Sequence, residues 1–286
     1  MRHPVVISLL LAGALVVSAC ARDESAETAK ALKDINVIDE SNLSSVMETV
    51  GDPNEAVAFF ARTSAENPER VDLKRSLVKS LVRARKPVEA AKIWREVAYG
   101  PQGTSADHVA LADALIRNND WKKAEAELNT IPPTHESFER YRLEAMVADS
   151  NKNWTKADSF YETAFGLTTK PSGVLNNWGY SKLTRGDYAG AEKLFTQALT
   201  YDSTLFTAKN NLVLSRAAQR KYDMPIVAMT QTERAELLYT AALTAIKQGD
   251  VATGKALLQE AVDTHPQYFE QAARALETLD ATVTQG

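Results

Sequence analysis

The chain has 286 residues, of which 44% are hydrophobic and 24% are charged, and its formal net charge at pH 7 is -4. This balance argues against a nucleic-acid-binding protein, which normally carries a basic excess. The single cysteine excludes a framework of intramolecular disulfides. Glycine and proline number only 12 and 10, so the chain contains few residues that oppose helix formation.

The first twenty residues are arranged like a secretory signal, with a basic start, an apolar stretch from Val5 to Val17, and small residues before Cys20. Ending on cysteine resembles a bacterial lipoprotein signal, although Val17 stands where leucine is usual. The resemblance implies cleavage before Cys20 and lipidation of that residue. Three acyl chains would hold the protein on a membrane, because each buried methylene contributes about 0.8 kcal/mol. An ordinary cleaved signal and a short membrane helix are the alternatives.

Ala21 follows the cysteine, and the residues from there to about Asn36 are small, polar or charged. An Asp after the lipidated cysteine tends to retain enterobacterial lipoproteins in the inner membrane. Its absence here favours the outer membrane, with the protein facing the periplasm. We therefore predict a signal peptide at residues 1–19, and a lipidated cysteine with a flexible tether at residues 20–36.

Three series of residues recur through the body of the chain in one register, with successive steps of 34, 34, 33 and 34 residues. Each copy has a small residue, a large residue four positions later, and Pro, Trp or Tyr three positions earlier. The small residues are Ala56, Ala90, Ala124, Ala157 and Ala191, and the large ones are Phe60, Trp94, Leu128, Tyr161 and Phe195. A period of this length is typical of proteins in which each repeat is one supersecondary unit.

Residues 172–205 form the best copy, which contains Gly179, Tyr188, Ala191 and Phe195. This copy resembles the tetratricopeptide signature, in which Gly, Tyr, Ala, Phe or Tyr, Ala and Pro recur at fixed positions. It departs from the signature at Ser203, where proline is usual. The resemblance implies an all-α fold, a tetratricopeptide-repeat superhelix of stacked antiparallel helix pairs.

The conserved positions of the signature have simple physical roles in this copy. Gly179 and Ala191 are small, so they allow neighbouring helices to approach closely, while Phe195 fills the space between them. Gly186 should end the first helix with a positive φ, which glycine adopts without steric cost. One repeat cannot bury its apolar stripe alone, so the copies are expected to stack.

We predict a repeat array over residues 37–268, followed by a capping helix and tail at residues 269–286. The first five repeats are predicted at residues 37–70, 71–104, 105–137, 138–171 and 172–205, the sixth at 206–234 and the seventh at about 235–268. In the sixth, Pro225 occupies the alanine position, so its second helix should be broken or shortened. A new helix should start near Thr230, with Glu233 placed for a capping box. The last helix is expected from about Tyr268 to Leu279.

The sequence offers no constellation of residues for catalysis. Its four histidines (His3, His108, His135 and His265) lack the spacing of metal ligands, and no phosphate-binding, dinucleotide-binding or nucleophile-elbow motif is present. We therefore predict no enzymatic activity, no metal and no cofactor. An aromatic series could line a ligand cage, but its register predicts packing in the core: Trp94, Trp121, Trp154, Tyr161 and Phe195.

Candidate partner-binding residues lie on the first helix of each pair, which lines the inner face of a curved array. Asparagine amides on this face could hydrogen-bond an extended peptide, because an amide both donates and accepts. The candidates are Asn176, Asn177, Tyr180, Asn210, Asn211 and Leu214, together with a basic strip of Arg75, Lys79 and Arg83. The alternatives are asparagines that serve the fold and a basic strip that is only a solvated face.

The order of signal, tether, repeats and a damaged repeat is similar to the TadD-type lipoproteins of tight-adherence (Flp) pilus systems. The similarity is best over residues 170–280, where Met224-Pro225 is followed by Ala235-Glu236-Leu237-Leu238-Tyr239 and Gly249-Asp250. It implies a pilotin-like outer-membrane lipoprotein that helps a pilus secretin localise or assemble. The alternatives are an accessory lipoprotein of the β-barrel assembly machinery, a cell-wall or division scaffold and, with least support, an enzyme.

Replacement of the lipidated residue tests the predicted anchor. Cys20→Ser should abolish incorporation of labelled palmitate and move the protein from the membrane fraction to the soluble fraction. Cell fractionation and mass spectrometry of the mature N-terminus would measure both effects. A wild-type protein that carries no acyl group at Cys20 would contradict the prediction.

Overall fold

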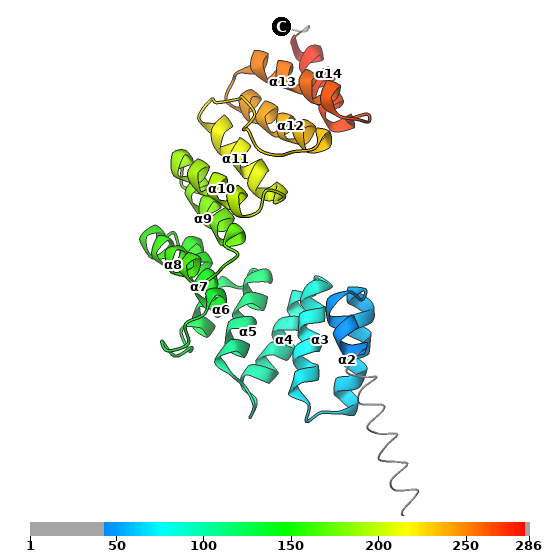
Figure 1. The fold of residues 1–286 in the computed structure, drawn as a ribbon, viewed down its shortest axis with the longest axis vertical. Coiled ribbons are helices and arrows are strands. Elements are labelled where there is room, and N and C mark those ends of the chain that lie inside the picture. Colours follow the sequence, from blue (N-terminus) through cyan, green and yellow to red (C-terminus); the bar gives the residue numbers. More distant parts are fainter. Residues whose placement is uncertain (1–42, 284–286) are drawn as a thin grey trace, which may run out of the picture. The chain divides into compact units, whose positions relative to one another are not determined.

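The computed structural model describes residues 43–283, and these residues contain α-helices joined by turns and no β-strand (Figure 1). The predicted signal peptide, Cys20 and the tether lie outside the described residues. None of the helices in the described part combines the length and apolar character that a membrane crossing requires. The chain forms two compact units, which divide between Thr104 and Ser105.

The first unit contains two helix pairs. Residues 43–49 are helical and precede α2 (Pro53–Glu66), and α3 (Val71–Arg83) is followed by α4 (Pro87–Ala98). Proline begins both α2 and α4, where its missing N–H has no helical partner to lose. The helices pack in sequence, α2 on α3 and α3 on α4. This order is the one expected for stacked pairs.

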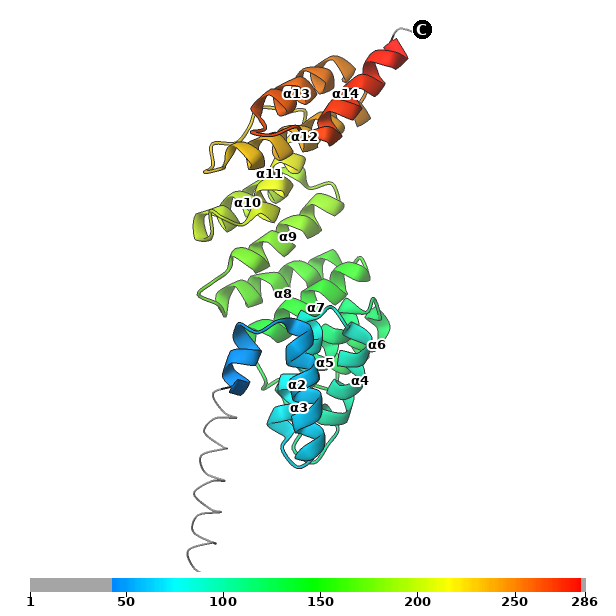
Figure 2. The same cartoon turned by 90° about the vertical axis from the view of Figure 1, so that its right-hand side faces the viewer.

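The second unit continues the same alternation of paired helices. Its helices are α5 (Ser105–Arg117), α6 (Trp121–Leu128), α7 (Phe138–Ser150), α8 (Trp154–Gly166), α9 (Ser172–Thr184), α10 (Tyr188–Tyr201), α11 (Phe206–Ala218), α12 (Gln231–Lys247), α13 (Val251–Thr264) and α14 (Glu270–Val283). In both views α9 lies beside α10 and α12 beside α13 (Figure 1, Figure 2). The predicted all-α class is confirmed.

The turn inside each pair repeats in the backbone as well as in the sequence. In six copies a residue with positive φ lies two positions after the last residue of the first helix: Arg85, Asn119, Lys152, Gly186, Arg220 and Gly249. The positive φ predicted for Gly186 is confirmed, with a value of 85°. Only two of these residues are glycine. For the other four, the left-handed conformation costs about 1–2 kcal/mol per residue, because the Cβ atom lies close to the backbone. Packing of the helix pair on either side has to compensate for that cost.

The repeated small and large residues form the core between adjoining helices. All five alanines of the series have an exposed fraction of 0%, and the large residues that follow them are between 0% and 6% exposed. Gly179 contacts the ring of Phe195 so closely that an added Cβ would lie 2.6 Å from its Cε1 atom. The predicted packing roles of Gly179, Ala191 and Phe195 are therefore confirmed.

The sixth repeat loses its second helix, as the proline in the alanine position predicts. Residues 219–230 contain no helix, and Met224 and Met229 of this segment pack beside α11 and α12. The helical chain resumes with a capping box. The Thr230 Oγ1 atom accepts from the backbone N–H of Glu233 at 3.1 Å, and the Glu233 carboxylate accepts from the backbone N–H of Thr230 at 2.8 Å. The last helix begins at Glu270, two residues later than predicted.

The close contact at Gly179 generates a stability prediction with an internal control. Gly179→Ala should lower the free energy of unfolding by about 1–3 kcal/mol, because the new methyl group overlaps the buried Phe195 ring. Gly173 lies on the same helix, and a Cβ added there meets nothing within 4 Å. Gly173→Ala should therefore leave the free energy of unfolding unchanged or raise it by up to about 1 kcal/mol. Urea denaturation followed by circular dichroism measures both. Equal effects of the two substitutions would contradict this account of the packing.

Candidate functional site

The second unit contains a cavity of about 530 Å³ on the side of its first helices. It is lined from α7, α9 and α11, and also by Trp121 at the start of α6 and by Trp154 and Tyr161 of α8. Its walls are mostly apolar, with aromatic side chains from Trp121, Trp154, Tyr180 and Phe206. We refer to this cavity and its lining residues as the groove.

The groove brings together most of the asparagine set predicted from the sequence. Asn176, Asn177 and Tyr180 line it from α9, and Asn210 and Asn211 line it from α11. Leu214 is half-buried on α11 and does not line the groove. Tyr180 is 55% exposed although it is a large aromatic residue. Partner binding by these residues remains a prediction.

The asparagine amides connect successive first helices to one another. The Asn211 Nδ2 atom donates to Asn176 Oδ1 at 3.1 Å, and the Thr240 hydroxyl of α12 donates to Asn210 Oδ1 at 2.8 Å. A weaker contact of 4.0 Å joins Asn177 Nδ2 to the Met146 sulfur of α7. Each amide can form up to four hydrogen bonds. These contacts therefore serve the fold and still leave donors and acceptors on the groove surface.

A half-buried carboxylate, Asp149, forms part of the groove floor. It accepts hydrogen bonds from Tyr161 Oη at 2.8 Å and from Ser181 Oγ at 2.7 Å. Burial raises the pKa of Asp149, and the two hydroxyl groups only partly oppose this effect. Burial and the nearby Asp149 charge also raise the pKa of Tyr161 well above its ordinary value. The hydroxyl of Tyr161 therefore acts as a donor at neutral pH.

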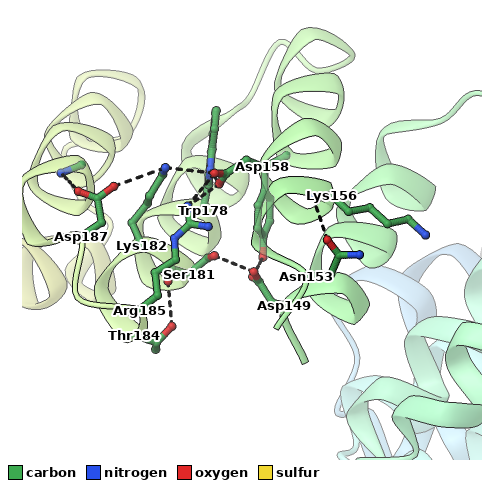
Figure 3. Close-up of polar contacts among 12 residues, drawn as sticks. Asp149, Asn153, Lys156, Asp158, Trp178, Ser181, Lys182, Thr184, Arg185 and Asp187 are labelled. Carbon is green, nitrogen blue, oxygen red and sulfur yellow. Dashed lines mark hydrogen bonds and ion pairs between the residues drawn. The ribbon is translucent and has the colours of Figure 1, made fainter. Parts of the chain in front are cut away.

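A second carboxylate, Asp158, has a different environment although it lies on the adjacent helix α8 (Figure 3). It accepts from Arg185 at 2.6 and 2.8 Å, from the Trp178 indole at 2.6 Å and from Lys182 at 3.2 Å. Burial opposes ionisation of Asp158, but these hydrogen bonds outweigh it and hold the pKa below its ordinary value. Asp158 thus joins α8 to α9 as the centre of an ion-pair network.

The predicted basic strip lies on α3, in the first unit, and its three residues differ in their contacts. Arg83 donates to the carbonyl oxygens of Met47, Glu48 and Gly51 at 2.9, 2.8 and 2.6 Å, so it caps the helix formed by residues 43–49. Arg75 donates to the carbonyl oxygen of Gln102 at 2.9 Å, and Lys79 is exposed. Partner binding by this strip stays a prediction, and Arg83 also has a structural role.

Sequence reasoning missed part of the groove. Trp94, Tyr161 and Phe195 are buried, as the register predicts, and Tyr161 also lines the groove. The expectation of core packing is wrong for Trp121 and Trp154, which are half-buried and line the groove. Both tryptophans stand three positions before a repeat alanine, at the start of a second helix, and this position was available as a signal. Residues 43–283 contain no cluster of three or more side chains suited to a metal ion.

Comparison with known proteins identifies the fold. No family model matches the sequence, and no curated protein matches it. The structure is similar to a chain of the APC/C hetero-tetramer Cut9-Hcn1, with a TM-score of 0.60 and 17% identity over 83% of this chain and 48% of that chain. This chain therefore spans about half the length of that neighbour.

Two bacterial repeat proteins have similar structures. A tetratricopeptide repeat protein from Parabacteroides merdae gives a TM-score of 0.55 at 14% identity, over 83% of this chain and 96% of that one. The C-terminal part of a TPR repeat-containing protein from Cytophaga hutchinsonii gives 0.50 at 15% identity, over 82% and 98%. The class is thus an all-α tetratricopeptide-repeat fold.

The two carboxylates generate opposite pH predictions. Because the folded-state pKa of Asp158 is lowered, its ionisation stabilises the fold above the ordinary value of 3.8 and this contribution is lost as the pH falls through the lowered pKa. Asp158→Asn should therefore lower stability by about 1–2 kcal/mol near neutral pH, and the deficit should shrink in acid.

Asp149→Asn is the matched comparison for this effect. Its folded-state pKa is raised, so protonation favours the folded wild type at pH values between 3.8 and the raised value. The deficit of Asp149→Asn should therefore grow as the pH falls through that window. Urea midpoints of wild type and both variants over a pH series measure the two differences. Parallel pH profiles for the two variants would contradict the assignment.

Proposed function

We propose that this protein is a lipid-anchored adaptor of a bacterial envelope, which binds a segment of another protein in the groove. The observation that carries the proposal is the groove itself, an apolar cavity of about 530 Å³ with polar amides along α9 and α11. Apolar walls with a few placed polar groups are typical of binding sites, where the walls supply affinity and the polar groups fix orientation.

The arrangement of the groove favours a polypeptide as the bound molecule. Asn176 and Asn177 follow one first helix and Asn210 and Asn211 follow the next, so amide groups recur along the groove at the spacing of neighbouring helices. An extended segment presents backbone donors and acceptors in a regular row, which amides can match in both directions. The exposed Tyr180 ring would then pack against side chains of the bound segment.

For the particular pathway, we propose assembly of a tight-adherence (Flp) pilus, with the protein anchored at Cys20 on the periplasmic face of the outer membrane. The support comes from the sequence: a lipoprotein-like signal, a repeat array and a damaged repeat with Met224-Pro225 resemble the TadD-type lipoproteins. A secretin or another pilus component would be the partner. An accessory role in the β-barrel assembly machinery, or an envelope scaffold, is the alternative function.

Purification from crosslinked membranes tests the groove and the partner together. Tyr180→Ala should lower partner recovery by about tenfold or more, as expected for an aromatic anchor at a binding site. Tyr201→Ala is a matched control, because its ring is 53% exposed compared with 55% for Tyr180 and does not line the groove. Quantitative mass spectrometry of the recovered proteins provides the measurement.

The identity of the recovered protein decides between the pathways. A secretin among the proteins that depend on Tyr180 would support the pilus role, whereas the β-barrel assembly complex would favour the alternative. Recovery of every partner at wild-type level with Tyr180→Ala would exclude the groove as the binding site. Neighbouring genes for a pilus ATPase, secretin and prepilin would support the first reading independently.

A further inference from the structure

We propose that the groove selects a partner segment that carries a lysine or arginine side chain, and that Asp149 is the ion partner of this side chain. The inference rests on the proposed function, since it names the chemistry of the segment that the groove binds. It goes beyond that proposal because it assigns the groove a preference for a positively charged side chain and names the residue that recognises this charge.

The charge of the groove lining is one-sided. Among the described residues that line it, Asp149 is the only one with an acidic side chain, and none is lysine or arginine. A cation brought by a partner would therefore meet a single carboxylate, whereas a peptide carboxylate would meet a like charge. This composition disfavours recognition of a free peptide C-terminus.

Asp149 and Asp158 provide an internal comparison of two half-buried carboxylates. Asp158 accepts hydrogen bonds from two cations, Arg185 and Lys182, whereas Ser181 donates to Asp149 (Figure 3). The other donor to Asp149 is the hydroxyl group of Tyr161. A carboxylate has about four acceptor positions, so Asp149 can accept further hydrogen bonds from the groove side. A half-buried carboxylate that no cation hydrogen-bonds is costly to keep ionised, and a ligand cation would relieve that cost.

Arg185, whose charge acts on Asp149, and Arg142 of the same helix as Asp149 are each paired with another carboxylate. Arg185 is bonded to Asp158, and Arg142 donates to Asp113 Oδ1 at 3.1 Å. The hydrogen bonds to Asp149 come from Tyr161 and Ser181 and not from these two cations. The Arg185 charge lowers the pKa of Asp149, but burial has the larger effect and raises it. A cation that donates a hydrogen bond directly to Asp149 would therefore come from the bound segment.

The aromatic walls suit the remainder of a basic side chain. Trp121, Trp154 and Tyr180 can contact the aliphatic stem of lysine or arginine, which commonly lies along apolar surface while its charged end reaches a polar group. The Arg185 guanidinium lies 5.6 Å from the centroid of the Trp154 ring, so this ring already interacts with a cation from within the chain. A second cation–π contact with Trp121 or Tyr180 would add to the ion pair.

Binding of three short capped peptides to the full-length protein in detergent tests the proposal. The peptides are acetyl-Ala-Xaa-Ala-amide with arginine, norleucine or glutamate at Xaa, so they differ only in the central side chain. The chain has four tryptophans, and 5-fluorotryptophan gives one ¹⁹F signal for each. Trp121 and Trp154 line the groove, while Trp94 and Trp178 do not.

The arginine peptide should shift the Trp121 and Trp154 signals at about tenfold lower concentration than the norleucine peptide, and the glutamate peptide should bind most weakly. Asp149→Asn should abolish the difference between arginine and norleucine. Glu162→Gln is the matched control, because it removes one negative charge from an exposed position of α8 outside the groove, and it should leave the preference unchanged.

Two other outcomes would contradict the proposal, and they differ in what they exclude. Equal binding of the arginine and norleucine peptides by the wild type, or a preference that survives Asp149→Asn, would overturn the charge preference and leave the proposed groove intact. Failure of all three peptides to shift Trp121 and Trp154 would overturn both the groove and the preference. The comparison of peptides on the wild type stands even if Asp149→Asn fails to fold.

Discussion

Close packing of small residues against large side chains of a neighbouring helix underlies the repeated helix pairs. At Gly179 the space for a Cβ is filled by the buried ring of Phe195, and Ala191 of the same pair is fully buried. A helix pair of this kind cannot bury its apolar stripe alone, so its stability depends on its neighbours. The buried pairs of alanine and large residue recur along the chain, and this packing on both sides of the turns offsets the cost of a positive φ at Arg85 and Lys152.

Stacking of this kind leaves the first helices with a surface that no second helix covers. In the second unit, that surface carries amides that bond across neighbouring helices and aromatic rings that line a cavity. The polar groups beneath it separate into two kinds. Asp158 accepts hydrogen bonds from two cations of the α9 region and so connects α8 to α9. Asp149 accepts hydrogen bonds from two hydroxyl groups and lines the groove. The structural role of Asp158 and the proposed recognition role of Asp149 therefore differ in the hydrogen-bond partners of each carboxylate.

The damaged sixth repeat shows how much of the pattern an array can lose. Pro225 excludes a second helix, yet Met224 and Met229 of the irregular segment still cover apolar surface of α11 and α12. The next helix, α12, then begins after Thr230, which forms a reciprocal pair of hydrogen bonds with Glu233. Burial of apolar area, more than helical structure itself, is what the neighbouring helices require at this position.

The sequence by itself determined the period of the repeats, and with it the all-α class, because the same residue types return at a fixed spacing. It also determined the loss of the sixth second helix and the capping box, because each depends on residues close together in the chain. The sequence also placed five residues of two successive first helices on one face of the predicted array: Asn176, Asn177, Tyr180, Asn210 and Asn211. Only the tertiary structure decided which side chains complete the groove, since Trp121, Met146 and Asp149 come from helices one or two repeats away. It alone separated Asp149 from Asp158, because the cations that neutralise Asp158 belong to the next helix pair. Charge compensation depends on distances in space, and a single sequence does not contain them.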